Sequence, residues 1–271
     1  CRTAGAVGDR GPEGPGRGLG TRSAGGKRMK TAIVTGASAG IGRAVAGRML
    51  ASGWHVGLIA RRADPLHELA DPYGDSAVAL PLDVTDADAV QVAFHDFAER
   101  AGRVDCLFNN AGIFTPAAPI DEIAVDDWRR AVDVNLTGMF LCARMAFRIM
   151  RRQAPQGGRI INNGSISAHV PREGAAPYTA TKHAVTGLTR QIALDGRPFD
   201  IACGQIDIGN AETDLLRGIA EAARATGREP PPTMDVSHVA DAVLAMADLP
   251  LSANVLFQTI MATRMPYVGR G

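Results

Sequence analysis

Short apolar runs alternate with longer amphipathic segments along most of this chain, and this alternation restricts the possible folds more than any other feature. Strands that are apolar throughout and separated by helices predict a parallel sheet covered on both faces. We therefore expect a doubly wound α/β fold with a mostly parallel, seven-stranded sheet. The expected strands lie within KTAIVTG, WHVGLIAR, AVALPLDV, VDCLFNNAG, RIINNGSIS, FDIACGQID and NVLFQTIMA.

The helices are expected between these runs, including a long one over 126–153 and another over about 178–194. A sheet of this size accommodates the whole chain from Met29, since α/β domains often exceed 200 residues. We predict one domain over 29–271. Segment 209–233, which contains GREPPPT, is the least regular part and is expected to be either a lid over a site or a surface excursion.

The first 28 residues differ in composition from the rest. They are rich in glycine, proline and arginine, with six basic and two acidic residues, and they lack apolar periodicity. Such a segment cannot bury enough apolar surface to offset its chain entropy. We predict that 1–28 form a disordered extension without the apolar core of a secretory signal. Met29 is a possible natural start.

Charge and cysteine content exclude several classes of protein. The chain has 29 basic and 28 acidic residues, which gives no general electrostatic reason to bind nucleic acid or a membrane. No apolar run reaches about 18 residues, so no membrane span is expected, and we predict a cytoplasmic protein. Cys106, Cys142 and Cys203 lie in apolar runs without CxxC spacing, which favours buried thiols over disulfides or a metal site.

A glycine-rich turn follows the first expected strand. It reads TGASAGIG over 35–42 and precedes an expected helix. Glycines let the backbone approach a pyrophosphate, and a helix N-terminus offers free N–H groups to an anion. The turn therefore predicts a dinucleotide site of the Rossmann type. Its expected contacts come from Gly36, Ser38, Gly40, Ile41 and Gly42.

The GxxxGxG spacing, together with Asn-Asn-Ala-Gly at 109–112 and Tyr-x-x-x-Lys at 178–182, resembles the short-chain dehydrogenase/reductase family in its compact one-domain branch. The resemblance extends from Met29 to the C-terminus. It implies an enzyme that transfers a hydride between a nicotinamide cofactor and a carbonyl or secondary alcohol. It also implies assembly as a homodimer or homotetramer.

The resemblance implies a catalytic tetrad. Tyr178 is its acid/base, Lys182 one helical turn later supplies positive charge, Ser165 thirteen residues before Tyr178 polarises the carbonyl, and Asn135 holds a water that connects Lys182 to solvent. Taken singly, each has a plainer explanation: a surface pair for Tyr178 and Lys182, a cap for Ser165, and a backbone contact for Asn135.

Further cofactor contacts are implied by position. Asp83 and Val84 are expected to hold the adenine ring; Asn110, Ala111 and Gly112 to line the ribose and nicotinamide side, with Tyr178 and Lys182; and Ala211 and Thr213 to bind the carboxamide. The chain departs from the family in one turn, where Ile208-Gly209 replaces the usual Pro-Gly.

The second expected strand ends with Ala60, Arg61 and Arg62. An NAD enzyme needs an acidic residue here for the ribose 2′-hydroxyl, whereas arginines suit a 2′-phosphate. The sequence therefore favours NADP over NAD, although Ala39 occupies a place where many NADP-preferring relatives carry a basic residue.

Other functions stay open at this point. The main alternative is a non-catalytic NADP-binding sensor or scaffold, against which the complete tetrad argues. A sugar epimerase or dehydratase of the extended branch would show TGxxGxxG spacing and a larger C-terminal domain. The substrate is a small molecule of unassigned identity, in a pocket expected from Ile113, Phe114, Ile166, His169 and segment 209–233.

Overall fold

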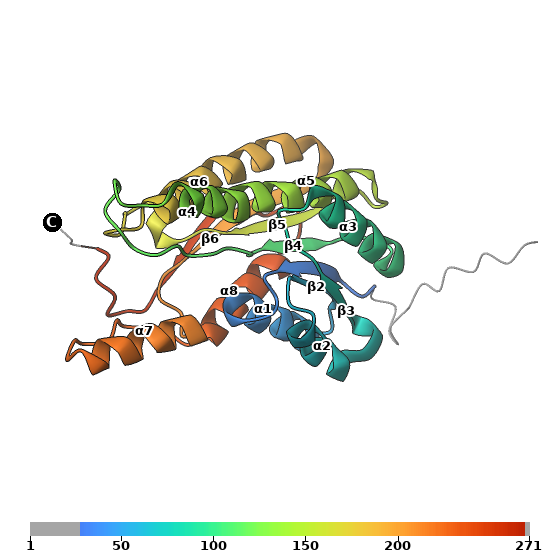
Figure 1. Cartoon of the computed structure of the whole chain (residues 1–271). Coiled ribbons are helices and arrows are strands. Elements are labelled where there is room, and N and C mark those ends of the chain that lie inside the picture. Colours follow the sequence, from blue (N-terminus) through green and yellow to red (C-terminus); the bar gives the residue numbers. More distant parts are fainter. Residues whose placement is uncertain (1–27, 269–271) are drawn as a thin grey trace, which may run out of the picture.

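The computed structural model describes residues 28–268, except the side chain of Leu215. It contains one seven-stranded sheet in the order β3-β2-β1-β4-β5-β6-β7 (Figure 1). Every pairing between these strands is parallel, which confirms the doubly wound fold. The strands are β1 (Thr31–Thr35), β2 (His55–Ala60), β3 (Ala77–Pro81), β4 (Cys106–Asn109), β5 (Gly158–Asn163), β6 (Ile201–Ile208) and β7 (Phe257–Ile260).

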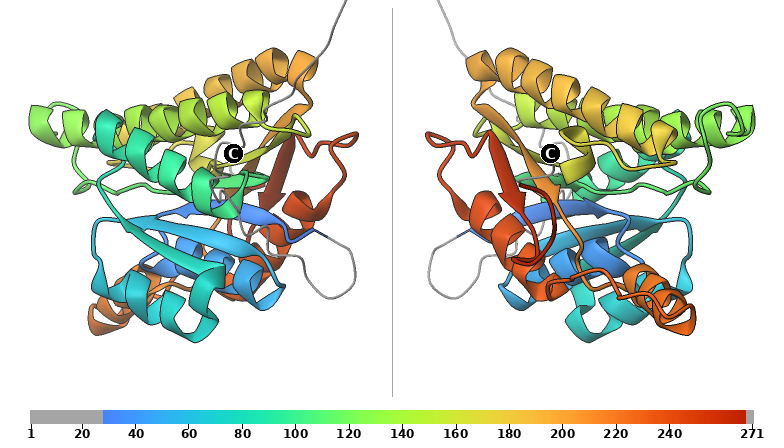
Figure 2. Two further views of the ribbon diagram at one scale, coloured as in Figure 1. Left: turned by 90° about the vertical axis from the view of Figure 1, so that its right-hand side faces the viewer. Right: turned by 90° about the vertical axis from the view of Figure 1, so that its left-hand side faces the viewer.

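Helices cover both faces of the sheet. In Figure 1, α3, α4, α5 and α6 lie on one side and α1, α2, α7 and α8 on the other. The side views in Figure 2 show the sheet enclosed between these two layers. The α-helices are α1 (Gly40–Ala51), α2 (Asp64–Ala70), α3 (Ala87–Ala101), α4 (Val125–Val132), α5 (Met139–Arg152), α6 (Ala176–Gly196), α7 (Asp214–Ala225) and α8 (Val236–Asp248). Short 3-10 turns are η1 (Asp71–Ser76), η3 (Ile166–Ala168) and η4 (Arg197–Phe199), and η2 (Asp133–Gly138) is a π-helical turn.

Each face of the sheet has its own apolar core, because successive strand residues point to opposite faces. In β1, Ala32 and Val34 pack with residues of α1 and α8, whereas Ile33 packs with residues of α3 and α5. Leu107 and Phe108 of β4 divide between the two cores in the same way. Burial on both faces explains why the central strands consist mainly of apolar residues.

The strand order reverses between β1 and β4, which are neighbours in the centre of the sheet. Doubly wound sheets bind ligands at such a switch point, beyond the carboxyl ends of the strands. The glycine turn after β1 and Asn110 after β4 both lie at this edge. The fold therefore brings two of the predicted motifs together.

Several helices differ from the expectations. The long helix predicted over 126–153 is interrupted by the π-helical turn η2 between α4 and α5. Segment 209–233 was expected to be irregular, but it contains α7, whose first turn is capped by Thr213 through its hydroxyl. Helix α8, for which no residue range was predicted, packs against α1.

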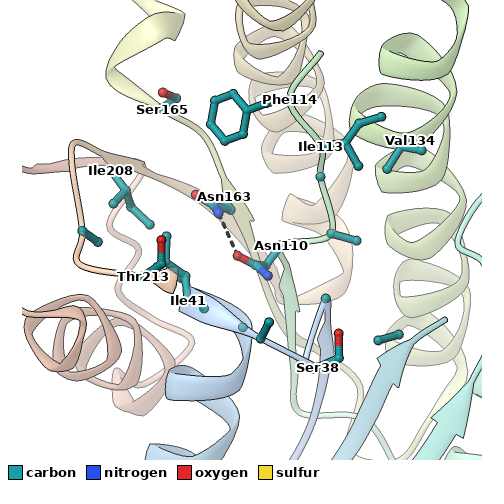
Figure 3. Close-up of a pocket in the computed structure, with 18 of the residues that line it drawn as sticks. Ser38, Ile41, Asn110, Ile113, Phe114, Val134, Asn163, Ser165, Ile208 and Thr213 are labelled. Carbon is teal, nitrogen blue, oxygen red and sulfur yellow. Dashed lines mark hydrogen bonds between the residues drawn. The ribbon is translucent and has the colours of Figure 1, made fainter. Parts of the chain in front are cut away.

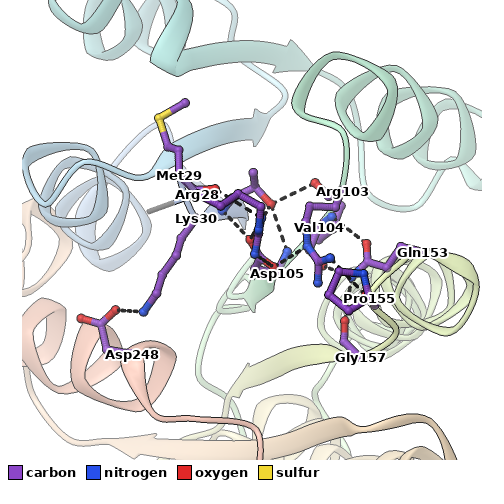
Figure 4. Close-up of polar contacts among 11 residues, drawn as sticks. Arg28, Met29, Lys30, Arg103, Val104, Asp105, Gln153, Pro155, Gly157 and Asp248 are labelled. Atoms are coloured by element: carbon purple, nitrogen blue, oxygen red, sulfur yellow. Dashed lines mark hydrogen bonds and ion pairs between the residues drawn. The ribbon is translucent and has the colours of Figure 1, made fainter. Parts of the chain in front are cut away.

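At the opposite edge of the sheet, Asp105 collects donors from three sides (Figure 4). Arg28 binds both of its carboxylate oxygens at 2.9 Å, Arg103 Nε donates at 2.6 Å, and the backbone N–H of Thr31 donates at 2.9 Å. Burial alone would raise the pKa of Asp105, but these contacts hold the pKa below its usual range. Arg28, the last residue of the predicted extension, is thus bound to Asp105, the residue directly before β4. Residues 1–27 lie outside the described part, and the division at 28/29 stays a prediction.

Three further features of residues 28–268 concern the cysteines, membrane-crossing helices and metal-binding clusters. Cys106, Cys142 and Cys203 are free and buried, as predicted. Within this range there is neither a helix suited to crossing a membrane nor a cluster of side chains able to hold a metal ion.

Candidate active site

A cavity of about 700 Å³ opens at the carboxyl edge of the sheet. Its walls come from the turns after β1, β2, β3, β4, β5 and β6 and from the start of α6 (Figure 3). Every predicted cofactor-binding residue lines it, and so do three of the four predicted catalytic residues. The predicted residues in the lining are Gly36, Ser38, Gly40, Ile41, Gly42, Arg61, Arg62, Asp83, Val84, Asn110, Ala111, Gly112, Ser165, Tyr178, Lys182, Ala211 and Thr213.

Two glycines of the glycine-rich turn occupy places where a side chain would not fit. Gly36 and Gly40 have φ angles of 70° and 54°, in the region that favours glycine. A Cβ on Gly36 would lie 2.7 Å from Asn110 Nδ2, and one on Gly42 would lie 2.2 Å from the carbonyl oxygen of Gly36. Glycine at positions 36 and 42 therefore lets the turn pack closely against Asn110 and its own backbone, and the turn as a whole lines one side of the cavity.

Helix α1 begins at Gly40 without a side-chain cap. Its N-cap residue is Ala39, and no acidic residue lies in its first turn. The first N–H groups of a helix need partners from outside the helix. With the helix dipole, these groups can hold a phosphate, so this end of the cavity fits a dinucleotide.

Two arginines stand at the end of β2. Arg61 and Arg62 are exposed, line the cavity and make no ion pair with the described residues. Their guanidinium groups are therefore available to a phosphate, whose geometry they match.

Asp83 and Val84 follow β3 as predicted. Asp83 Oδ1 accepts from the backbone N–H and the hydroxyl of Thr85, at 3.0 and 2.8 Å. Val84 packs closely against Gly138, where a Cβ would lie 2.8 Å from Val84 Cγ2. Asp83 thus shapes its own turn, and its second carboxylate oxygen has no hydrogen bond to the described residues.

Tyr178 and Lys182 lie one turn apart on α6. The Lys182 ammonium lies 5.5 Å from the centroid of the Tyr178 ring, and it donates a hydrogen bond of 2.7 Å to the carbonyl of Asn163. Burial lowers the pKa of Lys182 to about 8, although the negative charge of Asp207 acts to raise it. Burial raises the pKa of Tyr178, while a hydrogen bond with Ser165 and the charge of Arg172 act to lower it.

Ser165 caps η3, with its hydroxyl accepting from Ser167 N at 3.1 Å. Its backbone N–H donates to Asp207 Oδ1 at 3.0 Å, and the other oxygen of Asp207 binds His169 Nε2 at 2.8 Å. Asp207 is fully buried, and Gln205 Nε2 also donates to it. This carboxylate holds the backbone beneath Ser165 in place.

Asn135 is the predicted catalytic residue that does not line the cavity. It lies in the π-helical turn η2, a feature frequent at functional sites. Its amide binds both backbone groups of Ile113, at 2.7 and 3.0 Å, and reaches Thr181 Oγ1 at 3.4 Å. Asn135 therefore joins the segment after β4 to α6 next to Lys182, and its role with water stays a prediction.

Asn163 and Arg172 are polar residues of the cavity that were not predicted from the sequence, and Asn210 lies in segment 209–233 without having been singled out. Asn163 ends β5 and donates from Nδ2 to Asn110 Oδ1 at 2.8 Å, as Figure 3 shows. Asn110 Nδ2 is itself bound to the carbonyl of Thr35, which fixes both amide orientations. Asn163 Oδ1 is consequently a buried acceptor with no partner among the described residues. A polar residue ending an apolar strand was the available signal.

Apolar side chains close the end of the cavity next to Tyr178. Phe114 stacks on the Tyr178 ring with centroids 4.3 Å apart, and Ile113 lies beside it. Ile166 and His169, which the sequence also suggested, are not among the residues of this wall. His169 instead points its ring nitrogen at Asp207.

Known proteins resemble this chain over most of its length. A family model described as short chain dehydrogenase matches residues 30–224. A 3beta-hydroxysteroid dehydrogenase of Mediterraneibacter gnavus is 35% identical over 189 residues, covering 69% of this chain and 67% of that protein. A cis-4-hydroxycyclohexanecarboxylate dehydrogenase of Sinomonas cyclohexanicum is 36% identical over 200 residues, covering 73% and 79%.

Solved structures show the same likeness. The 3-ketoacyl-(acyl-carrier-protein) reductase of Brucella melitensis, in complex with NADH, superposes with a TM-score of 0.78 at 26% identity. The match covers 87% of this chain and 98% of that one.

Proposed function

The chain belongs to the short-chain dehydrogenase/reductase family, and on this basis we propose that it transfers a hydride between NADP(H) and the carbonyl or secondary alcohol group of a small molecule. The observation that carries the proposal is that Ser165, Tyr178 and Lys182 share one cavity with the uncapped glycine turn. A nucleotide bound at the glycine turn and the acid/base Tyr178 would thus lie in the same cavity.

The residues of the cavity fit a nicotinamide dinucleotide. The turn from Gly36 to Gly42 and the N-terminus of α1 are suited to the pyrophosphate. The orphaned Oδ1 of Asn163, at the other end, is suited to a hydroxyl or amide donor of the nicotinamide half. The NADH-bound relative supports the same class of cofactor.

Our choice of NADP rests on the second strand. Ala60 stands where a carboxylate would accept from a ribose 2′-hydroxyl, and Arg61 and Arg62 line the cavity beside it. Two guanidinium groups without a carboxylate favour a 2′-phosphate.

The chemistry assigned to the chain's own residues follows from their positions. Bound NADPH supplies the hydride. Tyr178 gives its proton to the carbonyl oxygen during reduction, while the Ser165 hydroxyl donates a hydrogen bond to that oxygen. Lys182, at one helical turn from Tyr178, keeps positive charge near the phenolate that forms. Asn135 holds the segment after β4 against α6. We also propose that the protein is a homodimer or homotetramer in the cytoplasm.

The test begins with nucleotide binding. NADPH and NADH are titrated separately into the purified full chain and followed by Trp quenching or nucleotide fluorescence. Tighter binding of NADPH, followed by turnover of ketones that is lost in Tyr178→Phe, is the expected result. Absence of binding of either nucleotide at micromolar concentration would contradict the proposal. Binding without turnover of a broad carbonyl and alcohol panel would favour the sensor or scaffold alternative.

A further inference from the structure

Arg172 places a positive charge at the end of the cavity that holds Ser165 and Tyr178. It lies in the loop between η3 and α6, six residues before Tyr178, and it lines the same cavity. The positive charge of Arg172 acts to lower the pKa of the Tyr178 hydroxyl, although burial outweighs it and the pKa stays raised. Arg172 is therefore close to the place where the proposed reaction occurs.

The guanidinium of Arg172 is held by a buried amide. Asn210 is 8% exposed, and its Nδ2 donates to the carbonyl of Pro232 at 3.2 Å. This contact leaves Asn210 Oδ1 to face the cavity, where it accepts from Arg172 Nη2 at 3.0 Å. Asn210 thus orients the guanidinium of Arg172. This contact uses one of the five N–H donors of the guanidinium.

No carboxylate compensates this charge within the described residues. Arg172 takes part in none of their ion pairs. Of the acidic residues in the cavity wall, Asp83 bonds Thr85 and Asp214 pairs with Arg217. Asp207 is buried beneath Ser165, where it binds three other donors, and its negative charge acts to raise the pKa of Lys182 and so favours the charged ammonium.

Arg172 is exposed, and its one hydrogen bond to the described residues, to Asn210, leaves other guanidinium N–H groups free. A guanidinium with free N–H groups binds a planar carboxylate through two parallel hydrogen bonds. Neighbouring apolar groups, Phe114 and Ile113, suit the carbon skeleton that would join such a carboxylate to the reacting carbon. We propose that the substrate is an oxo acid, or the matching hydroxy acid, whose carboxylate is bound by Arg172 while its carbonyl or hydroxyl lies at Ser165 and Tyr178.

This inference rests on the proposed function and specifies its substrate class. The test uses oxo acids of increasing length, from acetoacetate to 6-oxoheptanoate, each beside its methyl ester. Reduction of each is measured with the nucleotide that the full chain binds, and equilibrium binding of each acid and ester to the nucleotide-loaded protein is measured in parallel. The ester keeps the carbonyl and removes only the charge.

The expected result is that at least one acid surpasses its ester by about 10- to 100-fold in kcat/KM and in affinity, the range for a charge-assisted hydrogen bond. Arg172→Leu should bring the acid-to-ester ratio close to one, mainly by raising the KM for the acid. Arg172 also acts on the pKa of Tyr178, an effect common to acid and ester, so the ratio is the informative quantity. Asn210→Asp, which places a carboxylate beside Arg172 without removing it, should lower the ratio as well. Arg100→Leu, a change at an exposed position of α3, should leave the ratio unchanged.

Three outcomes would overturn the inference: esters that bind and react as well as every acid in the panel, an acid preference that persists in Arg172→Leu, or weaker NADPH binding by Arg172→Leu in the absence of substrate. The third would assign Arg172 to the nucleotide. All three presuppose a protein that binds nucleotide, whereas failure of nucleotide binding contradicts the proposed function itself.

Discussion

The ammonium of Lys182 donates a hydrogen bond of 2.7 Å to the main-chain carbonyl of Asn163 and is buried there without an ion pair to any residue in 28–268. A buried ammonium costs free energy that a neutral amine does not. The site therefore keeps a charge in place at the expense of stability.

This relationship predicts an unusual pH dependence. The pKa of Lys182 is about 8 in the folded protein, below the value of about 10.4 for an unfolded lysine. Between these values the unfolded chain binds one proton more, so the contribution of Lys182 to stability rises with pH, and its cost is fully present below about pH 8. Lys182→Met should raise the free energy of unfolding at pH 7, by up to about 3 kcal/mol, and should remove part of the rise between pH 8 and 10. Urea unfolding of the nucleotide-free proteins at both ends of this window measures it. Equal destabilisation by Lys182→Met at both pH values would contradict this reasoning.

Tyr178→Phe removes the proposed proton donor and leaves the ring that stacks on Phe114. We expect kcat for ketone reduction to fall by about 10²- to 10⁴-fold, the usual contribution of a general acid. Nucleotide affinity should change by less than about tenfold, since at most one hydrogen bond is lost. Steady-state kinetics and fluorescence titration separate the two effects. Tyr73→Phe, a change in η1 away from the cavity, is the matched control, and full activity in Tyr178→Phe would exclude the proposed mechanism.

Arg61→Ala and Arg62→Ala together test the choice of nucleotide. Loss of charge-assisted bonds to a 2′-phosphate should weaken NADPH binding by about 10- to 100-fold. NADH has no phosphate at this position, so its affinity should stay within about twofold. Isothermal titration of each nucleotide provides the comparison. Equal losses for NADPH and NADH would place these arginines on another part of the nucleotide.

Asn163→Ile tests whether the orphaned Oδ1 meets the nicotinamide half of the cofactor. Losing one neutral hydrogen bond should weaken binding of the complete nucleotide by about 3- to 10-fold. ADP lacks the nicotinamide and its ribose, so its affinity serves as the internal control. The bond from Lys182 is retained because it involves the main chain. A similar loss for ADP would mean that the variant disturbs the glycine turn through Asn110.

Arg159 illustrates a purely structural arginine. It is 2% exposed and donates to the carbonyls of Leu249, Pro250 and Ala253 and to the side chain of Asn254. Three of these acceptors gather at Nη2 and the fourth, Asn254 Oδ1, lies at Nη1. The single ammonium of a lysine cannot reach both positions, so it would leave one buried group unsatisfied. Arg159→Lys should therefore lower the free energy of unfolding by about 2 to 4 kcal/mol, with nucleotide affinity unchanged. Thermal and chemical unfolding, with binding as the control, measure this.

The sheet was predictable because its signal is repeated. Seven apolar runs correspond to seven strands, and the glycine turn and Tyr178 lie where the βα pattern places them. Helix α7 was missed because glycine and proline at 227–232 suggested an irregular segment, although the helix ends at Ala225, before them. The π-helical turn at Asn135 leaves no mark in the apolar periodicity that predicted one continuous helix.

Residues whose importance comes from three-dimensional contacts were harder to predict. Asn163 and Arg172 belong to no motif, and their position in the cavity depends on the side chains of Asn110 and Asn210. His169 was expected in the pocket wall, but the buried carboxylate of Asp207 attracts its ring. Partners of this kind are distant in sequence, so spacing along the chain does not reveal them.

Helix α1 has no residue of its own to finish its first turn, since Ala39 offers no side-chain acceptor. Under the proposed function, the pyrophosphate is the group that completes this end of the helix. Occupancy would then be coupled to local order: the first turn of α1 should exchange its amide protons readily in the free protein and slowly in the complex. The melting temperature should rise with nucleotide concentration by mass action. A missing cap thereby makes the cellular nucleotide pool a determinant of how long the folded chain survives.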